Sequence, residues 1–364
     1  MEVMIRLRLG LIALGVFLTV LNGCSQLGPG RIEIGRGHYN VVVQQTDNEQ
    51  MLLNLVRLRY RDTPFFLQVA SVSTNFEFQV SADSSAALNV GPDAYGLGVT
   101  GKMIESPTVT YTPLQGDQFV KELLSPMSLS TVVLLYHSGW AIDRIFNVTM
   151  QYLNGTPNAP SASGPTPAGV PKYEDFHRIT DILRILQKRG DVTLGQTKGS
   201  GLDQSMVLRI ASHAIDSPEG RELSELLRLP SGKTDYVITT TVDSSNGEEM
   251  SVVMRSLMAS LFYVSQGVQP LLEDETRGRV TITRDANGQP FDWRQVTGEL
   301  MQIRSSVDRP EFASVRVQYR GTWFYIDDSD LTSKSTFALL MSLFSLQAGD
   351  VPATSPVLTL PVAR

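Results

Sequence analysis

The stretch ASVRVQYRGTWFYID, residues 313–327, carries the clearest strand pattern in the chain. Apolar and polar residues alternate on both sides of Arg320-Gly321, a dipeptide at which a tight turn is expected. The stretch therefore predicts an antiparallel hairpin with strands from Ala313 to Tyr319 and from Thr322 to Asp327.

The second strand of this hairpin is unusually aromatic. Side chains along a strand point alternately to its two sides, so Trp323 and Tyr325 share one side and Phe324 and Ile326 share the other. We expect one pair to lie in the core and the other to touch a partner or a second copy, because adjacent exposed aromatics often mark an interface. Burial of both faces by a preceding domain is the alternative.

The region around the hairpin completes a compact unit. An amphipathic helix is expected before it and another after it, with one strand at each end of the unit. These elements are Arg279 to Thr283, Trp293 to Ile303, Ser333 to Leu346 and Val357 to Val362. Helices and strands in this order around one sheet predict an α+β unit over residues 269–364.

A separate N-terminal α+β domain is expected over residues 46–153. Thr46 and Glu49 stand at capping-box spacing ahead of a helical apolar stripe. The period then changes to two, with Phe76, Phe78 and Val80 alternating with polar neighbours, which predicts strands. Three short helices follow, Asp117 to Leu124, Ser130 to Ser138 and Ile142 to Leu153.

Residues 154–172 form the clearest predicted boundary. The segment contains five prolines separated mainly by Gly, Ser and Ala, and such a composition buries little surface. We expect a linker or a long exposed loop. A helix-rich α/β region, residues 173–268, should follow, with helices Tyr173 to Lys188, Glu219 to Leu229 and about Glu248 to Ser265, and strands near Met206 to Ala211 and Tyr236 to Val242. The predicted fold class is α+β and multidomain, with antiparallel sheets and packed helices.

The N-terminus has the pattern of an export signal. Arg6 and Arg8 precede a nearly unbroken apolar run from Leu9 to Leu21, which is too short to span a bilayer as a stable helix. The run ends in Leu21-Asn22-Gly23-Cys24.

This tetrapeptide resembles the lipobox of bacterial lipoprotein signals, with Asn22 where a smaller residue is usual. The resemblance implies cleavage after residue 23 and a diacylglyceryl group, commonly with a further acyl chain such as palmitate, on Cys24. Residues 24–45 would then be a lipidated tether. Since Ser25 stands where an aspartate would signal retention in the inner membrane, the resemblance implies a chain anchored by lipid in the outer membrane of a Gram-negative cell, facing the periplasm.

Composition narrows the classes of function. The chain has 364 residues, a single cysteine and a formal net charge of −6. With one cysteine, a disulfide framework is excluded, and the acidic charge argues against nucleic acid as a partner. The membrane, through the anchor, and an envelope protein or a second copy are the expected partners.

The search for catalytic patterns finds no complete signature. His38, His137, His177 and His213 are far apart, and none shares zinc-ligand spacing with another ligand. Ser265 is expected at a helix C-terminus and not in a nucleophile elbow, since Tyr263 takes the place of its first glycine. A flexible loop is expected at 195–201. The acids at Asp327, Asp328 and Asp330 suit the start of a helix better than a calcium loop. We expect no enzyme activity, no metal and no cofactor besides the covalent lipid.

One basic group remains. The first predicted helix ends in three arginines, Arg57, Arg59 and Arg61. We expect this helix end to be solvated. A partner's carboxylates or anionic lipid headgroups are the alternative ligands.

Two stretches, 48–67 and 323–362, resemble uncharacterised proteobacterial lipoproteins, and the element order of the C-terminal unit is similar to the ring-building motif of secretins. The resulting hypothesis is an outer-membrane-anchored lipoprotein that serves as a non-catalytic binding or scaffolding component of the cell envelope. The alternatives are a subunit of an envelope ring or export complex, and an envelope hydrolase whose site is assembled from distant segments.

Overall fold

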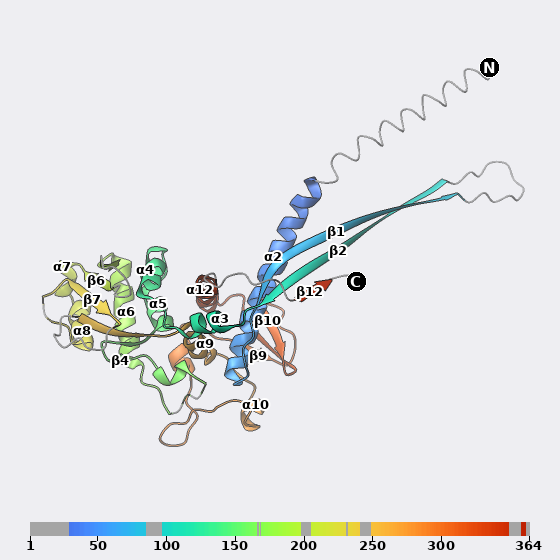
Figure 1. Cartoon of the computed structure of the whole chain (residues 1–364). Coiled ribbons are helices and arrows are strands. Elements are labelled where there is room, and N and C mark those ends of the chain that lie inside the picture. Colours follow the sequence, from blue (N-terminus) through green and yellow to red (C-terminus); the bar gives the residue numbers. More distant parts are fainter. Residues whose placement is uncertain are drawn as a thin grey trace, which may run out of the picture. The chain divides into compact units, whose positions relative to one another are not determined.

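The computed structural model describes residues 29–84, 97–165, 167, 169–197, 205–230, 232–240, 249–348 and 358–361. The chain divides into two units, Met1–Gln50 and Met51–Arg364. The fold is α+β, with antiparallel and mixed sheets and packed helices, as the sequence predicted (Figure 1).

Helix α2, Pro29–Arg59, begins in the first unit and ends in the second. The helix is already formed before Thr46, whose hydroxyl donates to the carbonyl of Val43 at 2.8 Å instead of capping a helix start. The expected start near Thr46 is therefore wrong, and the part of the expected tether from residue 29 onward is helical. Arg57 and Arg59 in the last turn suit the negative end of the helix dipole.

The main sheet of the second unit has six strands in the order β4-β3-β8-β7-β6-β5. The strands are β3 Met150–Leu153, β4 Thr156–Pro157, β5 Val192–Gln196, β6 Met206–Ile210, β7 Asp235–Thr239 and β8 Glu249–Met254. Strands β7 and β8 run parallel, whereas their neighbours pair antiparallel. The sheet thus joins the end of the expected N-terminal domain, β3, to strands of the expected middle region.

Helices pack against this sheet and against one another. They include α4 Leu129–His137, α5 Ile142–Thr149, α6 Glu174–Arg189, α7 Ser212–Ile215, α8 Pro218–Leu227 and α9 Leu257–Ser265. Helix α6 shows why they form: acids fill its first turn and Gly190, at φ 79°, ends it. Its fully buried residues, Phe176, Ile179, Ile182, Leu183 and Leu186, recur at helical spacing.

Much of the segment 154–172 is packed into the second unit, although Gly169 and Val170 are exposed. Ala159 and Ala162 are fully buried, and Asn158 donates through Nδ2 to the carbonyls of Asn147 and Met150 at 2.9 Å. A short 3-10 helix, η2 Pro160–Ser163, contacts α9. The expectation of a linker or exposed loop is corrected, because small residues here allow close packing that composition alone does not show.

Two of the expected helices are shorter than predicted, and part of each predicted range is a strand. The helix over 142–153 ends at Thr149 and continues as β3, and the helix over 248–265 is strand β8 followed by α9. In the second case the side chain of Ser256 accepts from the amide of Ala259 and starts the helix there. Strand β5 was not predicted.

The hairpin of residues 313–327 is confirmed. Strands β10 Ala313–Tyr319 and β11 Thr322–Asp327 pair antiparallel, and β9 Arg304–Ser306 joins β11. Arg320 at φ 51° and Gly321 at φ 86° form the turn, a conformation with two positive φ values that twists correctly for a hairpin. Helix α12, Leu331–Ala348, follows.

Two further expectations for the C-terminal unit are wrong. Residues 279–283 form no strand, and the helix expected over 293–303 is reduced to α11 Arg294–Thr297. Gly298 weakens the helix there, and Ile303 instead exchanges backbone bonds with the 267–269 segment. A short helix, α10 Leu272–Thr276, lies upstream.

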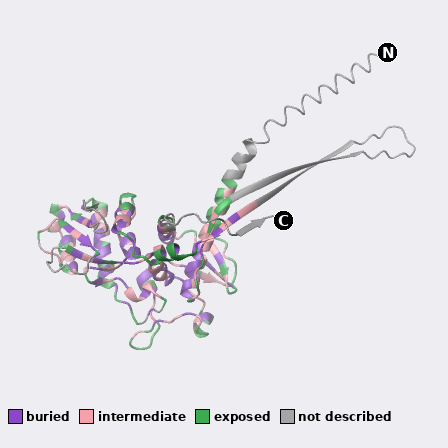
Figure 2. Ribbon diagram, in the orientation of Figure 1, coloured by how far each residue is buried: buried purple, intermediate pink, exposed green. Residues whose placement is uncertain are grey.

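The third sheet has the order β1-β2-β12. Strands β1 Leu67–Ser84 and β2 Leu97–Pro113 form a long antiparallel hairpin, which helix α3 Asp117–Leu124 follows. The expected closing strand exists as β12 Leu358–Pro361, but it pairs with β2 and not with the 313–327 hairpin. Buried residues run through the helices and strands of the second unit and include Thr110 and Thr112 near the base of β2 (Figure 2).

Candidate interaction surface

The sheet β9-β11-β10 has one face in the core. Phe324 and Ile326 are almost completely buried, and their partners across the hairpin, Val317 and Val315, are buried as well. The ring of Phe324 also lies edge-on to Tyr60 from the end of α2, at 6.0 Å between centroids. Of the two faces predicted from the sequence, this one is core.

The opposite face carries the other pair of aromatics. Trp323 lies between Gln318 of β10 and Ser306 of β9, while Tyr325 lies between Arg316 and Arg304. Trp323 and Tyr325 are both only partly buried. The strand register therefore places aromatic and cationic side chains side by side on the outer face of the sheet.

The loop from Val307 to Phe312 closes over part of this face. The guanidinium of Arg309 lies 5.8 Å from the ring centroid of Trp323, a cation-π arrangement. Arg316 Nη1 donates to the carbonyl of Pro310 at 2.9 Å, which holds the loop to β10. Val307 and Phe312 at its two ends are 72% and 74% exposed.

We call this set of residues the outer-sheet surface: Arg304, Val307, Arg309, Phe312, Arg316, Trp323 and Tyr325. The charge of Arg304 is only weakly neutralised, since its ion pair with Asp327, at 3.1 Å, lies at the protein surface. Trp, Tyr and Arg are the residue types that dominate the energetics of protein interfaces. The surface can therefore offer a partner both apolar contact and charge-assisted hydrogen bonds.

The arginines at the end of α2 do not form one basic edge. Arg59 is 8% exposed, and its Nη1 donates to the carbonyl of Thr281 at 3.0 Å. Burial lowers the pKa of Arg59, and its Nε has no hydrogen-bond partner in the described part of the chain. Arg57 donates to Asn54 at 3.2 Å, and Arg61 follows the helix with φ 60°. The expectation of a solvated helix end is wrong for Arg59.

The lipobox residues Leu21, Asn22 and Gly23, together with Cys24, lie outside the described residues. Their role stays a prediction from the sequence. Among the described helices, none is both long enough and apolar enough to cross a bilayer.

A pocket of about 620 Å³ lies at the start of α6. Tyr152, Pro160, Lys172, Tyr173 and Glu174 are among its lining residues. Ser161 also lines it, and its hydroxyl is buried with no hydrogen-bond partner in the described structure. This lining suits a small polar ligand, and no sequence pattern indicated the pocket.

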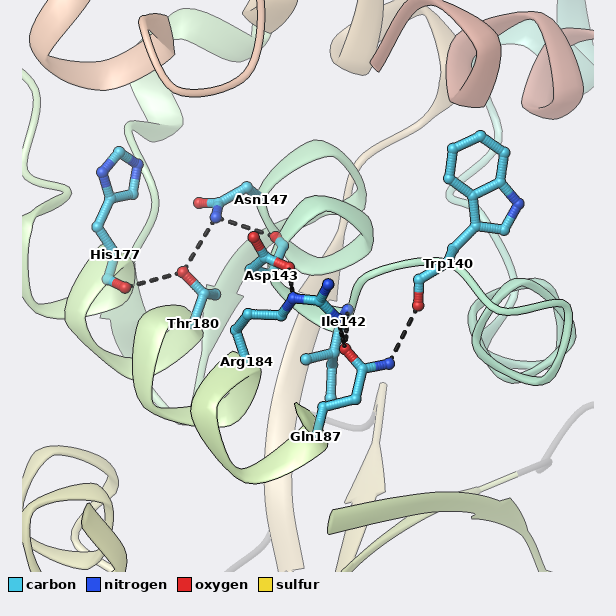
Figure 3. Close-up of polar contacts among 8 residues, drawn as sticks. All are labelled: Trp140, Ile142, Asp143, Asn147, His177, Thr180, Arg184 and Gln187. Atoms are coloured by element: carbon cyan, nitrogen blue, oxygen red, sulfur yellow. Dashed lines mark hydrogen bonds and ion pairs between the residues drawn. The ribbon is translucent and has the colours of Figure 1, made fainter. Parts of the chain in front are cut away.

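A polar network joins α5 to α6 (Figure 3). Asn147 donates through Nδ2 to the hydroxyl of Thr180 at 3.0 Å, and Thr180 donates to the carbonyl of His177. At the other end, Gln187 accepts from the amide of Ile142 at 3.0 Å and donates to the carbonyl of Trp140. The network therefore ties both ends of α5 to α6.

His177 is held neutral at its position in α6. Burial lowers its pKa from 6.5 to about 4, an effect that Glu174 opposes only partly. Its Nε2 is buried and has no hydrogen-bond partner among the described residues. An imidazole in this state is not protonated near neutral pH.

Arg255 is a buried residue that sequence analysis missed. It is completely buried and donates from Nη1 to the carbonyls of Asn147 and Met150, each at 2.7 Å. It also donates to the hydroxyl of Ser163 at 2.9 Å and to the carbonyl of Asn158, and it lies 3.9 Å from the ring centroid of Tyr263. Burial lowers the pKa of Arg255 to about 10. A lone arginine in the apolar stretch 250–264 was the available signal.

The other candidate residues have structural partners. Ser265 is fully buried at the end of α9, and its hydroxyl donates to the carbonyl of Phe262 at 2.7 Å. Asp330 accepts from the amide and hydroxyl of Ser333 at the start of α12, as expected of an acid beside a helix N-terminus. Among the residues searched, those that the structure describes, no group of three or more His, Cys, Asp or Glu could hold a metal ion.

Comparisons with protein-family models, with curated proteins and with solved structures found no match for this chain.

Proposed function

We propose that this protein is a lipid-anchored component of the outer membrane that binds another envelope protein through its outer-sheet surface. The role is non-catalytic scaffolding. The observation that supports it best is the division of strand β11 into a fully buried face and a partly exposed face that carries Trp323 and Tyr325.

The chemistry of the surface favours a protein as the ligand. Its aromatic side chains provide rigid apolar area, and Arg304, Arg309 and Arg316 surround them with hydrogen-bond donors that suit a partner's carboxylates. The exposed side chains of Val307 and Phe312 enlarge the apolar part. Exposed hydrophobic groups rimmed by polar residues are typical of interaction sites.

The membrane anchor is supported by the sequence. Cys24 follows a short apolar run with basic residues before it, and it is the single cysteine of the chain. One acyl chain binds a bilayer only marginally, so the two or three chains implied by the lipobox resemblance are needed for stable anchoring.

Alanine variants of neighbouring residues in β11 test the binding role. Phe324→Ala should lower the free energy of unfolding by about 3–5 kcal/mol, because it leaves a cavity in the core. Tyr325→Ala and Trp323→Ala should change it by about 1 kcal/mol or less, since these side chains are only partly buried. Chemical denaturation of the purified variants measures both effects.

Photo-crosslinking in the envelope tests the surface itself. A benzophenone amino acid at Tyr325 should give a discrete adduct that the change Arg316→Glu, on the neighbouring strand, weakens while the protein stays folded. Leu272 in α10, 73% exposed, is the matched control position and should give none. Equal and large losses of stability for Trp323→Ala, Tyr325→Ala and Phe324→Ala, or the absence of any adduct at Tyr325, would refute the proposal.

A further inference from the structure

The hairpin of β1 and β2 is much longer than the strands of the other sheets. The two strands have 18 and 17 residues, whereas strands in globular proteins average about five or six. The third strand, β12, pairs only with positions 108–111 near the base of the hairpin. A two-stranded ribbon without a covering layer is marginally stable in water, so this length calls for something to cover it.

The register gives the ribbon one apolar face. Paired positions, and positions two apart along a strand, lie on the same side of a sheet. The pairs Val72 with Val109, Phe78 with Met103, Val80 with Gly101 and Ala82 with Val99 therefore share a face. Phe76 and Leu97 belong to the same set, and Thr74, Ser84 and Glu105 are its polar members.

The other face is polar by the same rule. Its pairs are Ser73 with Thr108, Asn75 with Ser106, Gln79 with Lys102, Ser81 with Thr100 and Asp83 with Gly98. Glu77 also belongs to this face, opposite Ile104, which is its apolar exception. A ribbon that is apolar on one side and polar on the other suits a position between hydrocarbon and water.

The length of the apolar face fits a bilayer. The stretch from Phe76 to Ser84 measures roughly 30 Å along the strand at about 3.4 Å per residue. Tilted by about 45°, it would cover a height of about 22 Å, close to the apolar band of roughly 25 Å in outer-membrane sheets. Glu105, opposite Phe76 on the apolar face, stands at the base end of this stretch, where it would meet headgroups.

A single hairpin could not enter lipid alone. The outer edge of β1 is unpaired in the described sheet, and so is β2 between the turn and the positions that β12 covers. Unpaired backbone groups cost several kcal/mol each in hydrocarbon. Insertion therefore needs further copies of this chain that pair edge to edge until no edge is left.

We propose that the β1-β2 hairpins of several copies join into one closed membrane-inserted sheet, with their apolar faces toward lipid and their polar faces toward a water-filled interior. The inference rests on the proposed membrane anchoring of the chain. It does not depend on the outer-sheet surface. The length of the apolar stretch, close to the height of the apolar band in outer-membrane sheets, favours lipid over a covering protein as the occupant of this face.

The test uses the chain from residue 24 onward with Cys24→Ser and an N-terminal polyhistidine tag. Vesicles of phosphatidylethanolamine and phosphatidylglycerol with a nickel-chelating lipid recruit the tag, so that acylation is not required. Because Cys24 is the single cysteine, one environment-sensitive fluorophore can be placed on a new cysteine at each position from Phe76 to Ser81 in turn.

Membrane binding should shift the emission to the blue at positions 76, 78 and 80 and leave positions 77, 79 and 81 unchanged. Chemical crosslinking of the bound protein should give a closed oligomer. Phe78→Glu should abolish the shift and the oligomer, and Gln79→Glu, the same charge on the polar face, should preserve both. Unchanged emission at all positions of the vesicle-bound chain, the same shift on both faces, or a monomer on the membrane would overturn the proposal. Failure of anchoring through Cys24 in cells would leave these results intact.

Discussion

At the scale of the residue, neighbours in sequence have opposite roles in this protein. Phe324 lies in the core and Tyr325 beside it lies on the outer-sheet surface, because a strand alternates its side chains. Arg255, in contrast, brings distant segments together. Its buried guanidinium donates hydrogen bonds to the carbonyls of Asn147 in α5, Met150 in β3 and Asn158. Such a group is fixed by its hydrogen bonds and not by an acidic partner.

His177 should make the stability of the protein depend on pH. Its pKa is lowered to about 4 in the folded chain, whereas an unfolded chain binds the proton below about 6.5. Between these values the unfolded state binds more protons, so the stabilisation is complete above about pH 6.5 and is lost as the pH falls toward 4, by up to about 3 kcal/mol.

The matched variant is His177→Gln, which removes the titrating group. Urea unfolding of both proteins at about pH 7 and about pH 4.5 should show a smaller loss of stability on acidification for the variant. Protonation of carboxylates on acidification affects both proteins alike, so the difference between their losses of stability reports on His177 alone. An identical loss in both proteins would mean that His177 is protonated in the folded state as readily as in the unfolded state.

At the scale of the element, the turn between β10 and β11 depends on positive φ values. Gly321 has φ 86°, where a side chain is strained even though the space around it is open. Gly321→Ala should lower the free energy of unfolding by about 1–2 kcal/mol. Thermal or chemical denaturation measures this loss.

Gly195 in β5 is the control for that change. The space around it is also open, and its φ lies outside the positive range. Gly195→Ala should be neutral or stabilising by up to about 1 kcal/mol, because alanine reduces the entropy of the unfolded chain. If both substitutions have the same effect, the turn geometry is not the source of the loss at Gly321.

At the scale of the whole molecule, Cys24 should decide where the chain is found. Cys24→Ser removes the acyl acceptor and should release the protein from the outer-membrane fraction or leave it uncleaved. Density-gradient fractionation with immunodetection measures the distribution. A Cys24→Ser chain that still sediments with membranes after high-salt and carbonate washing would show a second attachment, for which the β1-β2 hairpin is the first candidate.

The sequence by itself determined the local elements whose pattern is complete within a short window. The 313–327 hairpin, α3 and α6 were predicted nearly to the residue, because their period, their turn residues and their helix ends are local. The alternation that separates Trp323 and Tyr325 from Phe324 and Ile326 was also available from the sequence. The resemblance of residues 21–24 to a lipobox likewise rests on the sequence alone.

Tertiary structure alone decided which elements meet. β3 and β8 pair across about a hundred residues, and β12 pairs with β2 instead of its neighbours in sequence. The proline-rich 154–172 segment is packed because Arg255 and Asn158 hold it through hydrogen bonds to carbonyl and hydroxyl groups that no pattern records. The burial of Arg59 could not be predicted either, because the group that accepts its hydrogen bond is a backbone carbonyl, that of Thr281. Contacts made through backbone groups carry no residue signature, and the chain has to fold before they exist.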